Sequence, residues 1–356
     1  MSKKSSTKIT RREFNRAALA SAAGASALAV GIPALASQKV KMTVGYHSLW
    51  ATVGEIFETL RHTNILELHG IEATWEKFTY GGPLGEGYVA GKIDNIIAAD
   101  VPVLRGLARR TGTVLHRTHD WRFAVVAQPD FKGGLADLKG KKFAGPFGTT
   151  VFPRTVRRFV EAGIKDPFKE ITIINQDVAE QANALQGKLV DAVVTWDPTT
   201  ERLVSQKIGK IIWESQPGDG AGWQGLSAEF IKKHGEDVVV RYLKAWIMAT
   251  WWASNNLELA HKWFGETSRI GADLLQVSAR ADRYLKAPTK DIKTMNFELL
   301  PTEVASAQEV MDFMLERKLL QNKLEVAPLV DMKYMRKAQA DIAAGKHEAL
   351  SKIKVV

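Results

Sequence analysis

Residues 88–102 read YVAGKIDNIIAADVP, and residues 184–198 read ALQGKLVDAVVTWDP. Each segment has the end of a helix, the pair Gly-Lys, an apolar strand with an internal aspartate, and a second aspartate close to a proline. The two aspartates are six residues apart in both segments, as Asp94 and Asp100 and as Asp191 and Asp197. A shared order of this length predicts a structural repeat, with one copy in each half of the chain.

Strands and helices alternate around both segments. Strands are expected at 39–46, 71–80, 93–99, 142–145, 171–174 and 189–195, with helices between them at 53–67, 85–90, 102–110, 151–162 and 177–186. Strands joined by helices of this length are typical of a mainly parallel α/β sheet. From about residue 227 to the end the pattern is mostly helical. Gly91 and Gly187 are expected to end their helices in the left-handed conformation.

Asp100 and Asp197 follow the carboxyl ends of their strands, one in each predicted half. In open parallel sheets a ligand binds outside these strand ends, where loops and helix N-termini converge. Two α/β lobes that face each other across a cleft would bring both ends to one site. The repeat therefore predicts a binding cleft between two lobes.

Several motifs of the chain resemble those of one family. Gly81-Gly82-Pro83 before a helix, Gly-Lys-x-Asp at 91–94 and Asp-x-Pro at 100–102 resemble the first domain of the sulfonate, nitrate and taurine family of periplasmic binding proteins. The stretch LADLKGKK at 135–142, followed by Gly148-Thr149-Thr150, resembles that family's entry into its second domain. The segment 184–198 resembles its most recognisable signature.

This resemblance covers roughly residues 40–235. It implies an α/β, two-lobed type II periplasmic-binding-protein fold, with the ligand cleft between the lobes and a helical C-terminal region. Lobe 1 is then expected at 37–125 and 225–356 and lobe 2 at 126–224, with hinge crossings near Arg122–Gln128 and Ile211–Leu226. The family also implies an ABC permease and an ATPase subunit as partners, and we expect a monomer.

The N-terminal segment 1–36 is predicted to be an export signal. Three lysines precede TRREFNR at 10–16, and an alanine-rich apolar stretch then runs to Ala34-Leu35-Ala36. A charged start, an apolar middle and a small-x-small end are typical of a cleaved signal peptide. The paired arginines resemble a twin-arginine (Tat) motif, with departures at Asn15 and Arg16, and a Sec signal is the alternative. Cleavage near Ala36 would release the chain into the periplasm.

Composition excludes several classes of site and partner. The 356 residues contain no cysteine, which excludes disulfides, thiolate metal sites, cysteine nucleophiles and a lipoprotein anchor. Of the net charge of +10, segment 1–36 contributes +5 from six Lys/Arg and one Glu, which leaves about +5 on the mature chain. No basic block with interleaved aromatics supports nucleic-acid binding. No apolar run after Ala36 is long enough for stable membrane insertion.

The strongest candidate for ligand binding is the stretch GPFGTT at 145–150, between a strand and a helix. Free N–H groups at a helix start, with hydroxyls and a glycine that allows close approach, can bind an anion without a full positive charge. Alternatively, Thr149 or Thr150 only caps its own helix. Gly82 and Pro83 begin a helix in the first half, where Gly-Pro alone would indicate a turn.

Further candidates lie at strand ends. A tryptophan there can pack on a flat or aliphatic ligand, as expected for Trp196. Asp100 and Asp197 are expected either to bind the ligand or to cap turns. The family resemblance places the loop after the first strand and Trp223 at the cleft. The predicted ligand-binding set is His47, Ser48, Trp50, Gly82, Pro83, Asp100, Gly148, Thr149, Thr150, Trp196, Asp197 and Trp223.

Other features have simpler interpretations. The arginines of the helix at 151–162, Arg154, Arg157 and Arg158, are expected on a solvated face. Trp246, Trp251 and Trp252 are expected in the core of the C-terminal region. The histidines lack metal-site spacing, and no phosphate loop, nucleophile elbow or dinucleotide fingerprint occurs, so no metal, cofactor or catalytic residue is expected.

Together these patterns predict the periplasmic substrate-binding component of an ABC transporter for a small anionic organic solute. An alkanesulfonate or taurine is the favoured ligand, and an aromatic acid, nitrate or a thiamine-precursor pyrimidine are alternatives. A periplasmic enzyme or a sensor partner of a membrane receptor would be functions of another class. An enzyme with an iron–sulfur cluster would need cysteine ligands, which the chain lacks.

Overall fold

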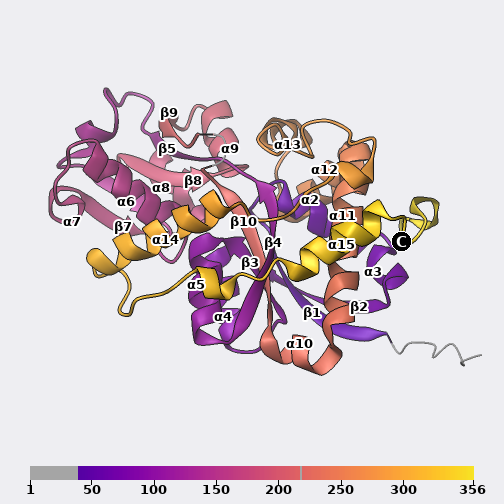
Figure 1. Cartoon of the computed structure of the whole chain (residues 1–356). Helices are drawn as coiled ribbons and strands as arrows, with labels where there is room; N and C mark the ends of the chain where they lie inside the picture. The colour runs from indigo at the N-terminus through magenta and orange to yellow at the C-terminus, as the bar shows by residue number, and fades with distance from the viewer. Residues whose placement is uncertain (1–38, 217–218) are drawn as a thin grey trace, which may run out of the picture. The chain divides into compact units, whose positions relative to one another are not determined.

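The structure is a computed structural model that describes residues 39–216 and 219–356. The predicted export signal, 1–36, lies outside the described residues. Residues 40–356 form one compact unit, whose elements are labelled in Figure 1. The strands are β1 Val40–His47, β2 Ile71–Phe78, β3 Asn95–Ala99, β4 Gly112–Asp120, β5 Phe123–Ala127, β6 Lys142–Gly145, β7 Thr172–Asn175, β8 Ala192–Trp196, β9 Lys210–Glu214 and β10 Ala221–Ser227.

Helices connect these strands and make up most of the C-terminal third. They are α2 Val53–His62, α3 Ile65–Leu68, α4 Gly81–Val89, α5 Asp100–Arg109, α6 Val151–Glu161, α7 Pro167–Glu170, α8 Gln181–Gln186, α9 Thr199–Ser205, α10 Ala228–His234, α11 Glu236–Asn255, α12 Leu257–Ser268, α13 Ala272–Ala279, α14 Pro301–Glu316 and α15 Lys333–Ala343. The prediction of a mostly helical segment after residue 227 is therefore confirmed.

The strands form two sets with the same spatial order. One is a five-stranded sheet, β7-β6-β8-β5-β9, and the other consists of a three-stranded sheet, β3-β10-β4, beside the parallel pair β1-β2. The buried Asn95 side chain joins β1 to β3, because its amide accepts from Gly45 N at 2.7 Å and donates to Gly45 O at 3.0 Å. With β1 joined to β3 in this way, the spatial order in the first set is β2-β1-β3-β10-β4. Each strand of that order has a counterpart at the same position of the five-stranded sheet.

The predicted repeat is confirmed by what its internal aspartates do. Asp94 Oδ2 accepts from Thr43 N at 2.7 Å, and Asp191 Oδ2 accepts from Lys142 N at 2.8 Å. Each carboxylate thus ties the entry of β3 or β8 to β1 or to β6, respectively. Gly91 has the expected left-handed conformation, with φ of 73°. The same expectation for Gly187 is wrong, because its φ is −76° and the next residue, a lysine, is left-handed instead.

The chain crosses twice between the two sets of strands. It passes from β4 to β5 through residues 121–122 and returns from β9 to β10 through residues 215–220. The predicted lobe boundaries, 125/126 and 224/225, fall inside β5 and β10. The residue limits of the two lobes and the hinge segments therefore stay predictions.

Burial follows the position of each strand. Every residue of β3 and of β8 is buried, because both strands are central and covered on both faces by helices. In β2, at the edge, buried or half-buried residues alternate with exposed ones. The two central strands of the repeat therefore anchor the two cores, and their carboxyl ends carry the residues of the candidate site.

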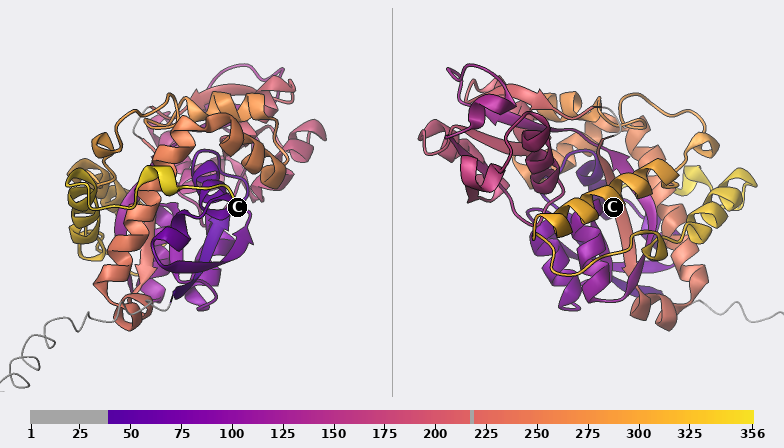
Figure 2. Two further views of the ribbon diagram at one scale, coloured as in Figure 1. Left: turned by 90° about the vertical axis from the view of Figure 1, so that its right-hand side faces the viewer. Right: turned by 60° about the vertical axis from the view of Figure 1, so that its left-hand side comes forward.

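The C-terminal helices pack on the first set of strands and reach across to the second. Helix α11 packs on α2 and α15, and its Trp246 is fully buried, as expected. Trp251 and Trp252 are half-buried and pack against that core from its edge. Helix α14 packs on both α5 and α6, and Figures 1 and 2 show it lying across that side of the molecule.

Some elements differ from the sequence prediction. The helix expected at 53–67 is broken, because Thr63 is extended, with φ of −130° and ψ of 162°, and separates α2 from α3. Helix α4 begins at Gly81 rather than residue 85. The antiparallel strands β4, β5, β9 and β10 were not predicted from periodicity, but the family resemblance implied two crossing strands near Arg122–Gln128 and Ile211–Leu226, and these segments overlap β5, β9 and β10.

Candidate functional site

A small cavity lies at the carboxyl ends of β3 and β8, between the two sets of strands. Its volume is about 30 Å³, little more than one water molecule occupies in the liquid. We call it the central cavity, and its lining is His47, Trp50, Gly81, Ala98, Ala99, Pro102, Trp121, Thr149, Thr150, Val151 and Trp196. A solute with several non-hydrogen atoms can enter only if the two sides separate.

Helix starts contribute part of this lining. Gly81 begins α4, and Thr149, Thr150 and Val151 lead into α6. Neither helix has a side-chain cap: Thr149 Oγ1 donates to Pro146 O at 2.7 Å, and Thr150 Oγ1 donates to a carboxylate elsewhere. The alternative that either threonine merely caps α6 is therefore wrong. The N-terminal ends of both helices present partial positive charge to the cavity.

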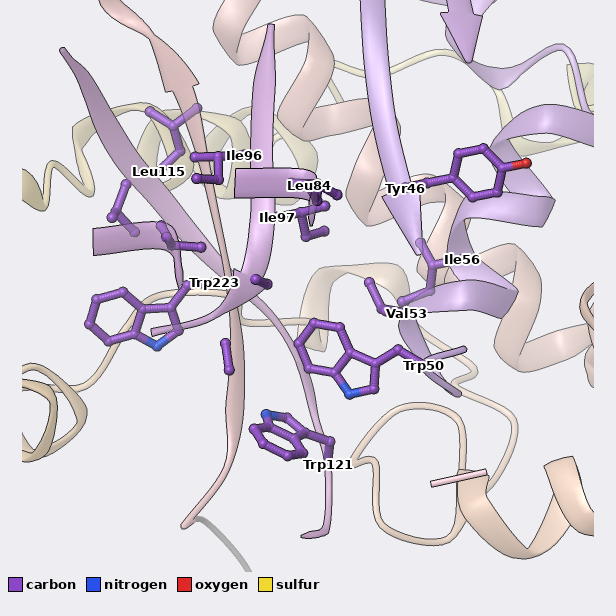
Figure 3. Close-up of a cluster of buried hydrophobic side chains, with 14 of the residues drawn as sticks. Tyr46, Trp50, Val53, Ile56, Leu84, Ile96, Ile97, Leu115, Trp121 and Trp223 are labelled. Carbon is purple, nitrogen blue, oxygen red and sulfur yellow. The ribbon is translucent and has the colours of Figure 1, made fainter. Parts of the chain in front are cut away.

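Two indole N–H groups lie at the cavity without hydrogen-bond partners. Trp50 is 5% exposed and Trp121 is 7% exposed, and in the described residues neither Nε1 atom has a partner. Their ring centroids are 5.4 Å apart, and the planes of the two rings are nearly perpendicular. Figure 3 shows the two rings beside the strand ends. A buried donor without an acceptor is unfavourable by about 1–3 kcal/mol. A bound acceptor would remove that penalty.

Two histidines beside Trp50 are neutral. His47 Nε2 lies 2.6 Å from Ile97 O, and burial lowers the pKa of His47 to about 4. His119 has its ring centroid 4.5 Å from that of Trp50, and burial lowers the pKa of His119 well below its ordinary value. Of the described residues that line the cavity, none carries a charge at pH 7. The site therefore offers neutral N–H donors.

These buried histidines set the pH dependence of stability. Burial lowers the pKa of His47, His69 and His116 to about 4, so between pH 6.5 and 4 the unfolded chain binds more protons than the folded chain. Each residue then removes about 1.4 kcal/mol of stability per pH unit as the pH falls. Burial raises the pKa of Asp197 and Asp282 to about 6, which acts in the opposite direction.

Burial also lowers the pKa of His119, and the four histidines together outweigh the two aspartates, so the free energy of unfolding is expected to fall by about 3–5 kcal/mol between pH 7 and pH 5. Urea unfolding at the two pH values measures this difference. A free energy that stays constant or rises at pH 5 would contradict the neutral state of these histidines.

Asp100 is held in an ion pair that joins the two sides of the cavity. The side chain follows β3 and is 4% exposed. Its Oδ2 accepts from Arg154 Nη2 of α6 at 2.5 Å, and its Oδ1 accepts from Thr150 Oγ1 at 2.6 Å. The expectation that Arg154 lies on a solvated face is wrong, whereas its neighbours Arg157 and Arg158 are half-exposed and pair with Glu161.

The carboxylate of Asp197 is likewise held in an ion pair with an arginine. Arg122 binds both its carboxylate oxygens, at 3.1 and 3.2 Å, and also pairs with Glu201 and Glu214. Burial raises the pKa of Asp197 to about 6 even with this arginine beside it. Like Asp100, Asp197 does not line the central cavity.

Two further hydrogen bonds connect β8 to the loop after β1. Trp196 Nε1 donates to Leu49 O at 2.7 Å, and Ala51 N donates to Asp197 O at 3.2 Å. Trp196 therefore forms one wall of the cavity and also joins the two sides. Opening the cavity has to break both bonds and the Asp100–Arg154 pair.

The structure brings five of the twelve predicted residues to the central cavity: His47, Trp50, Thr149, Thr150 and Trp196. Gly82, Pro83 and Gly148 line a larger groove next to it. Trp223 and Asp100 line a separate polar pocket, and Ser48 Oγ donates to Phe78 O at 3.2 Å. Contact of each residue with a solute stays a prediction.

Trp121 is the main residue that sequence reasoning missed. It follows Asp120 at the end of β4, in an Asp-Trp pair that reverses the Trp-Asp order of 196–197. That signal was present, but β4 was not predicted as a strand. Pro102, Ala99 and Gly81 were also missed, because they contribute shape rather than chemistry.

Known proteins resemble this chain in sequence and in structure. No family model matches it. It is 25% identical over 294 residues to a protein of Bacillus subtilis (strain 168) named provisionally as an aliphatic sulfonates-binding protein, and the match covers 78% of this chain and 82% of that protein. The alkanesulfonate-binding protein SsuA from Xanthomonas axonopodis pv. citri, solved with bound MOPS, superposes with a TM-score of 0.67 at 20% identity, over 83% of this chain and 99% of that one.

The chain has the two-lobed fold of periplasmic binding proteins. The predicted type II fold and the predicted resemblance to sulfonate-binding proteins are thereby confirmed. The fold is also similar to that of the desulfurization enzyme DSZB, whose mutant bound to biphenyl-2-sulfinic acid superposes with a TM-score of 0.60 at 12% identity, over 85% of this chain and 99% of that one. The fold alone therefore does not separate binding from catalysis.

Within residues 39–216 and 219–356, no group of three or more His, Asp or Glu side chains is arranged to hold a metal ion. Among the helices of that part of the chain, none is both long and apolar enough to cross a membrane.

Proposed function

We propose that this chain is the solute-binding component of an ABC importer and that it captures a small organosulfonate in the central cavity. The observation that carries the proposal is the pair of buried indole N–H groups, Trp50 and Trp121, which have no partners and lie beside the uncapped starts of α4 and α6. An anion with several acceptor oxygens would satisfy both indoles and the helix N-termini together.

A sulfonate suits this site better than other anions. It has three acceptor oxygens and stays ionised over the physiological pH range, so neutral donors suffice to bind it. The rings of Trp50, Trp121 and Trp196 provide apolar walls for an attached carbon chain, which disfavours inorganic nitrate. The sequence relative named for aliphatic sulfonates and the superposable alkanesulfonate-binding protein support the same class.

The arrangement also suits capture followed by release. The two carboxylates at the strand ends beside the cavity are paired within the protein, Asp100 with Arg154 and Asp197 with Arg122. A solute bound by neutral donors is not held by a full ion pair. A dissociation constant near the micromolar range, or about 8 kcal/mol of binding free energy, would permit delivery to a permease.

Delivery requires the two sides of the cavity to open and close. The cavity of about 30 Å³ corresponds to a closed form, and hinge closure around a solute is a common device of such proteins. The closed form would dock on the permease and ATPase subunits. We propose that the chain is exported to the periplasm, is cleaved near Ala36 and acts there as a monomer. We also propose that it binds its solute without converting it.

A thermal-shift panel on the chain from Ser37 onward tests this function. Alkanesulfonates, taurine, nitrate, aromatic carboxylates and pyrimidines would be added at equal concentration. A ligand at 100 times its dissociation constant adds about 2.7 kcal/mol of stability, so sulfonates are expected to raise the melting temperature. A rise with carboxylates or pyrimidines alone would overturn the sulfonate assignment. An enzyme related in activity to DSZB would instead convert biphenyl-2-sulfinic acid, which incubation with the protein would show.

A further inference from the structure

The central cavity continues into a groove on one side. This groove has a volume of about 530 Å³, within the range of pockets that bind small organic molecules. Gly81, Pro102 and Thr149 line both the groove and the cavity. The groove and the cavity therefore adjoin at these three residues, and a solute that enters the cavity when the two sides separate can extend into the groove.

The other two openings beside the cavity are unsuited to an organic chain. One contains the Asp100–Arg154 pair together with Asp219 and Glu303. The second is lined by several charged residues, among them Arg122. Each shares fewer residues with the central cavity than the groove does. Burying a carbon chain there would desolvate paired charges, which is unfavourable.

The groove itself is largely apolar. Phe147 is 40% exposed, and its ring centroid lies 4.2 Å from that of Phe152. Pro83 of α4 contributes to one side, and Met314 and Leu319 at the end of α14 contribute to another. The exposed ring, tilted by 37° against the buried one, offers an apolar surface for an aryl or alkyl group.

One cation in the groove has no partner. Arg105 lies on α5, one helical turn or about 5 Å along the axis beyond Pro102. Its Nη1 atom lies 3.9 Å from the position that a Cβ on Gly148 would occupy, so the side chain reaches the loop before α6. Among the described residues no carboxylate pairs with its guanidinium, whereas the neighbouring Arg109 pairs with Glu86 at 2.5 Å.

We propose that the solute is an elongated organosulfonate with a second anionic group. Its sulfonate occupies the central cavity, its carbon skeleton lies on Phe147 and Phe152, and its second anion binds Arg105. This inference rests on the proposed function and narrows its substrate class from simple alkanesulfonates to dianions such as sulfocarboxylates. A guanidinium that is unpaired and beside an apolar surface fits a carboxylate at the end of an aryl group.

Calorimetric titration with three probes tests this inference. Methanesulfonate fills the cavity alone, 4-methylbenzenesulfonate adds the carbon skeleton, and 4-sulfobenzoate adds the second anion at nearly the same size. We expect 4-sulfobenzoate to bind at least tenfold more tightly than 4-methylbenzenesulfonate, because charge-assisted hydrogen bonds are strong. Arg105→Gln should abolish this preference, and Arg105→Lys should keep part of it.

Arg157→Gln is the matched control, since it removes the same charge from a half-exposed site on α6 outside the groove, where Arg157 pairs with Glu161 and Glu309. Phe147→Ala should weaken both aryl probes and leave methanesulfonate unchanged, while Phe147 N can still donate to Asn175. Equal affinity for the two aryl probes, or a preference that survives Arg105→Gln, would overturn the dianion inference. Failure of every sulfonate to bind the wild-type chain would instead overturn the proposed function.

Discussion

Trp121→Phe is expected to weaken sulfonate binding by about 10- to 100-fold, because it removes one N–H donor from the cavity. The phenyl ring retains the aromatic contacts of Trp121 with Trp50 and Phe123, so the fold should be unaffected. In the free protein the same change removes a donor that has no partner. The variant should therefore be as stable as the wild type or slightly more stable, while it binds more weakly. Calorimetry and thermal unfolding measure these two effects separately.

Trp252→Phe is the matched control. Trp252 is half-buried on α11 and stacks on Trp263 with ring centroids 5.5 Å apart, remote from the cavity lining. It should leave affinity unchanged. Trp50→Phe should behave like Trp121→Phe, since its Nε1 is equally without a partner. If both cavity variants bind as tightly as the wild type, the indole groups do not contact the solute.

Arg154→Ala is expected to shift the protein toward an open form and to weaken binding by about 10- to 100-fold. The change leaves the Asp100 carboxylate, 4% exposed, without its cation. Breaking a buried ion pair from one side is unfavourable by about 3–5 kcal/mol. Separation of the lobes rehydrates the carboxylate, so much of this free energy favours opening rather than unfolding.

Small-angle scattering without ligand measures the shift, and calorimetry measures the affinity. The double variant Asp100→Asn, Arg154→Gln removes both charges and should recover most of the closed form and of the binding. Arg336→Ala, which removes an exposed ion-paired arginine of α15 outside the cavity lining, serves as the control. An unchanged radius of gyration together with unchanged affinity in Arg154→Ala would show that this pair does not hold the cavity closed.

Local sequence patterns were sufficient for the repeat and for the strand ends that carry the site. The Gly-Lys and Asp spacing predicted β3 and β8, and Asp94 and Asp191 have equivalent hydrogen bonds in the two copies. Helix starts at Gly81 and Val151 followed from Gly-Pro and Gly-Thr-Thr signals within a few residues. These features depend on residues close in sequence, where backbone preferences dominate.

The pairing of charges could not be read from the sequence. Arg154 follows a helical spacing with Arg158 that is typical of a solvated face, yet Asp100, 54 residues earlier, captures it. Arg122 binds Asp197 across 75 residues. Which partner a charged side chain finds depends on how the two halves face each other, and a short-range pattern does not contain that information. Trp121 was missed for a related reason, because β4 and β5 pair with strands distant in the chain.

The most direct test of the central claim is a crystal structure of the chain from Ser37 onward with an alkanesulfonate bound. We predict that the sulfonate oxygens lie within about 3.2 Å of Trp50 Nε1 and Trp121 Nε1 and point at the starts of α4 and α6. In that structure the central cavity should be larger than its present volume of about 30 Å³, with the same residues lining it. A sulfonate found elsewhere in the protein, with both indole N–H groups still unpartnered, would contradict the assignment of the site.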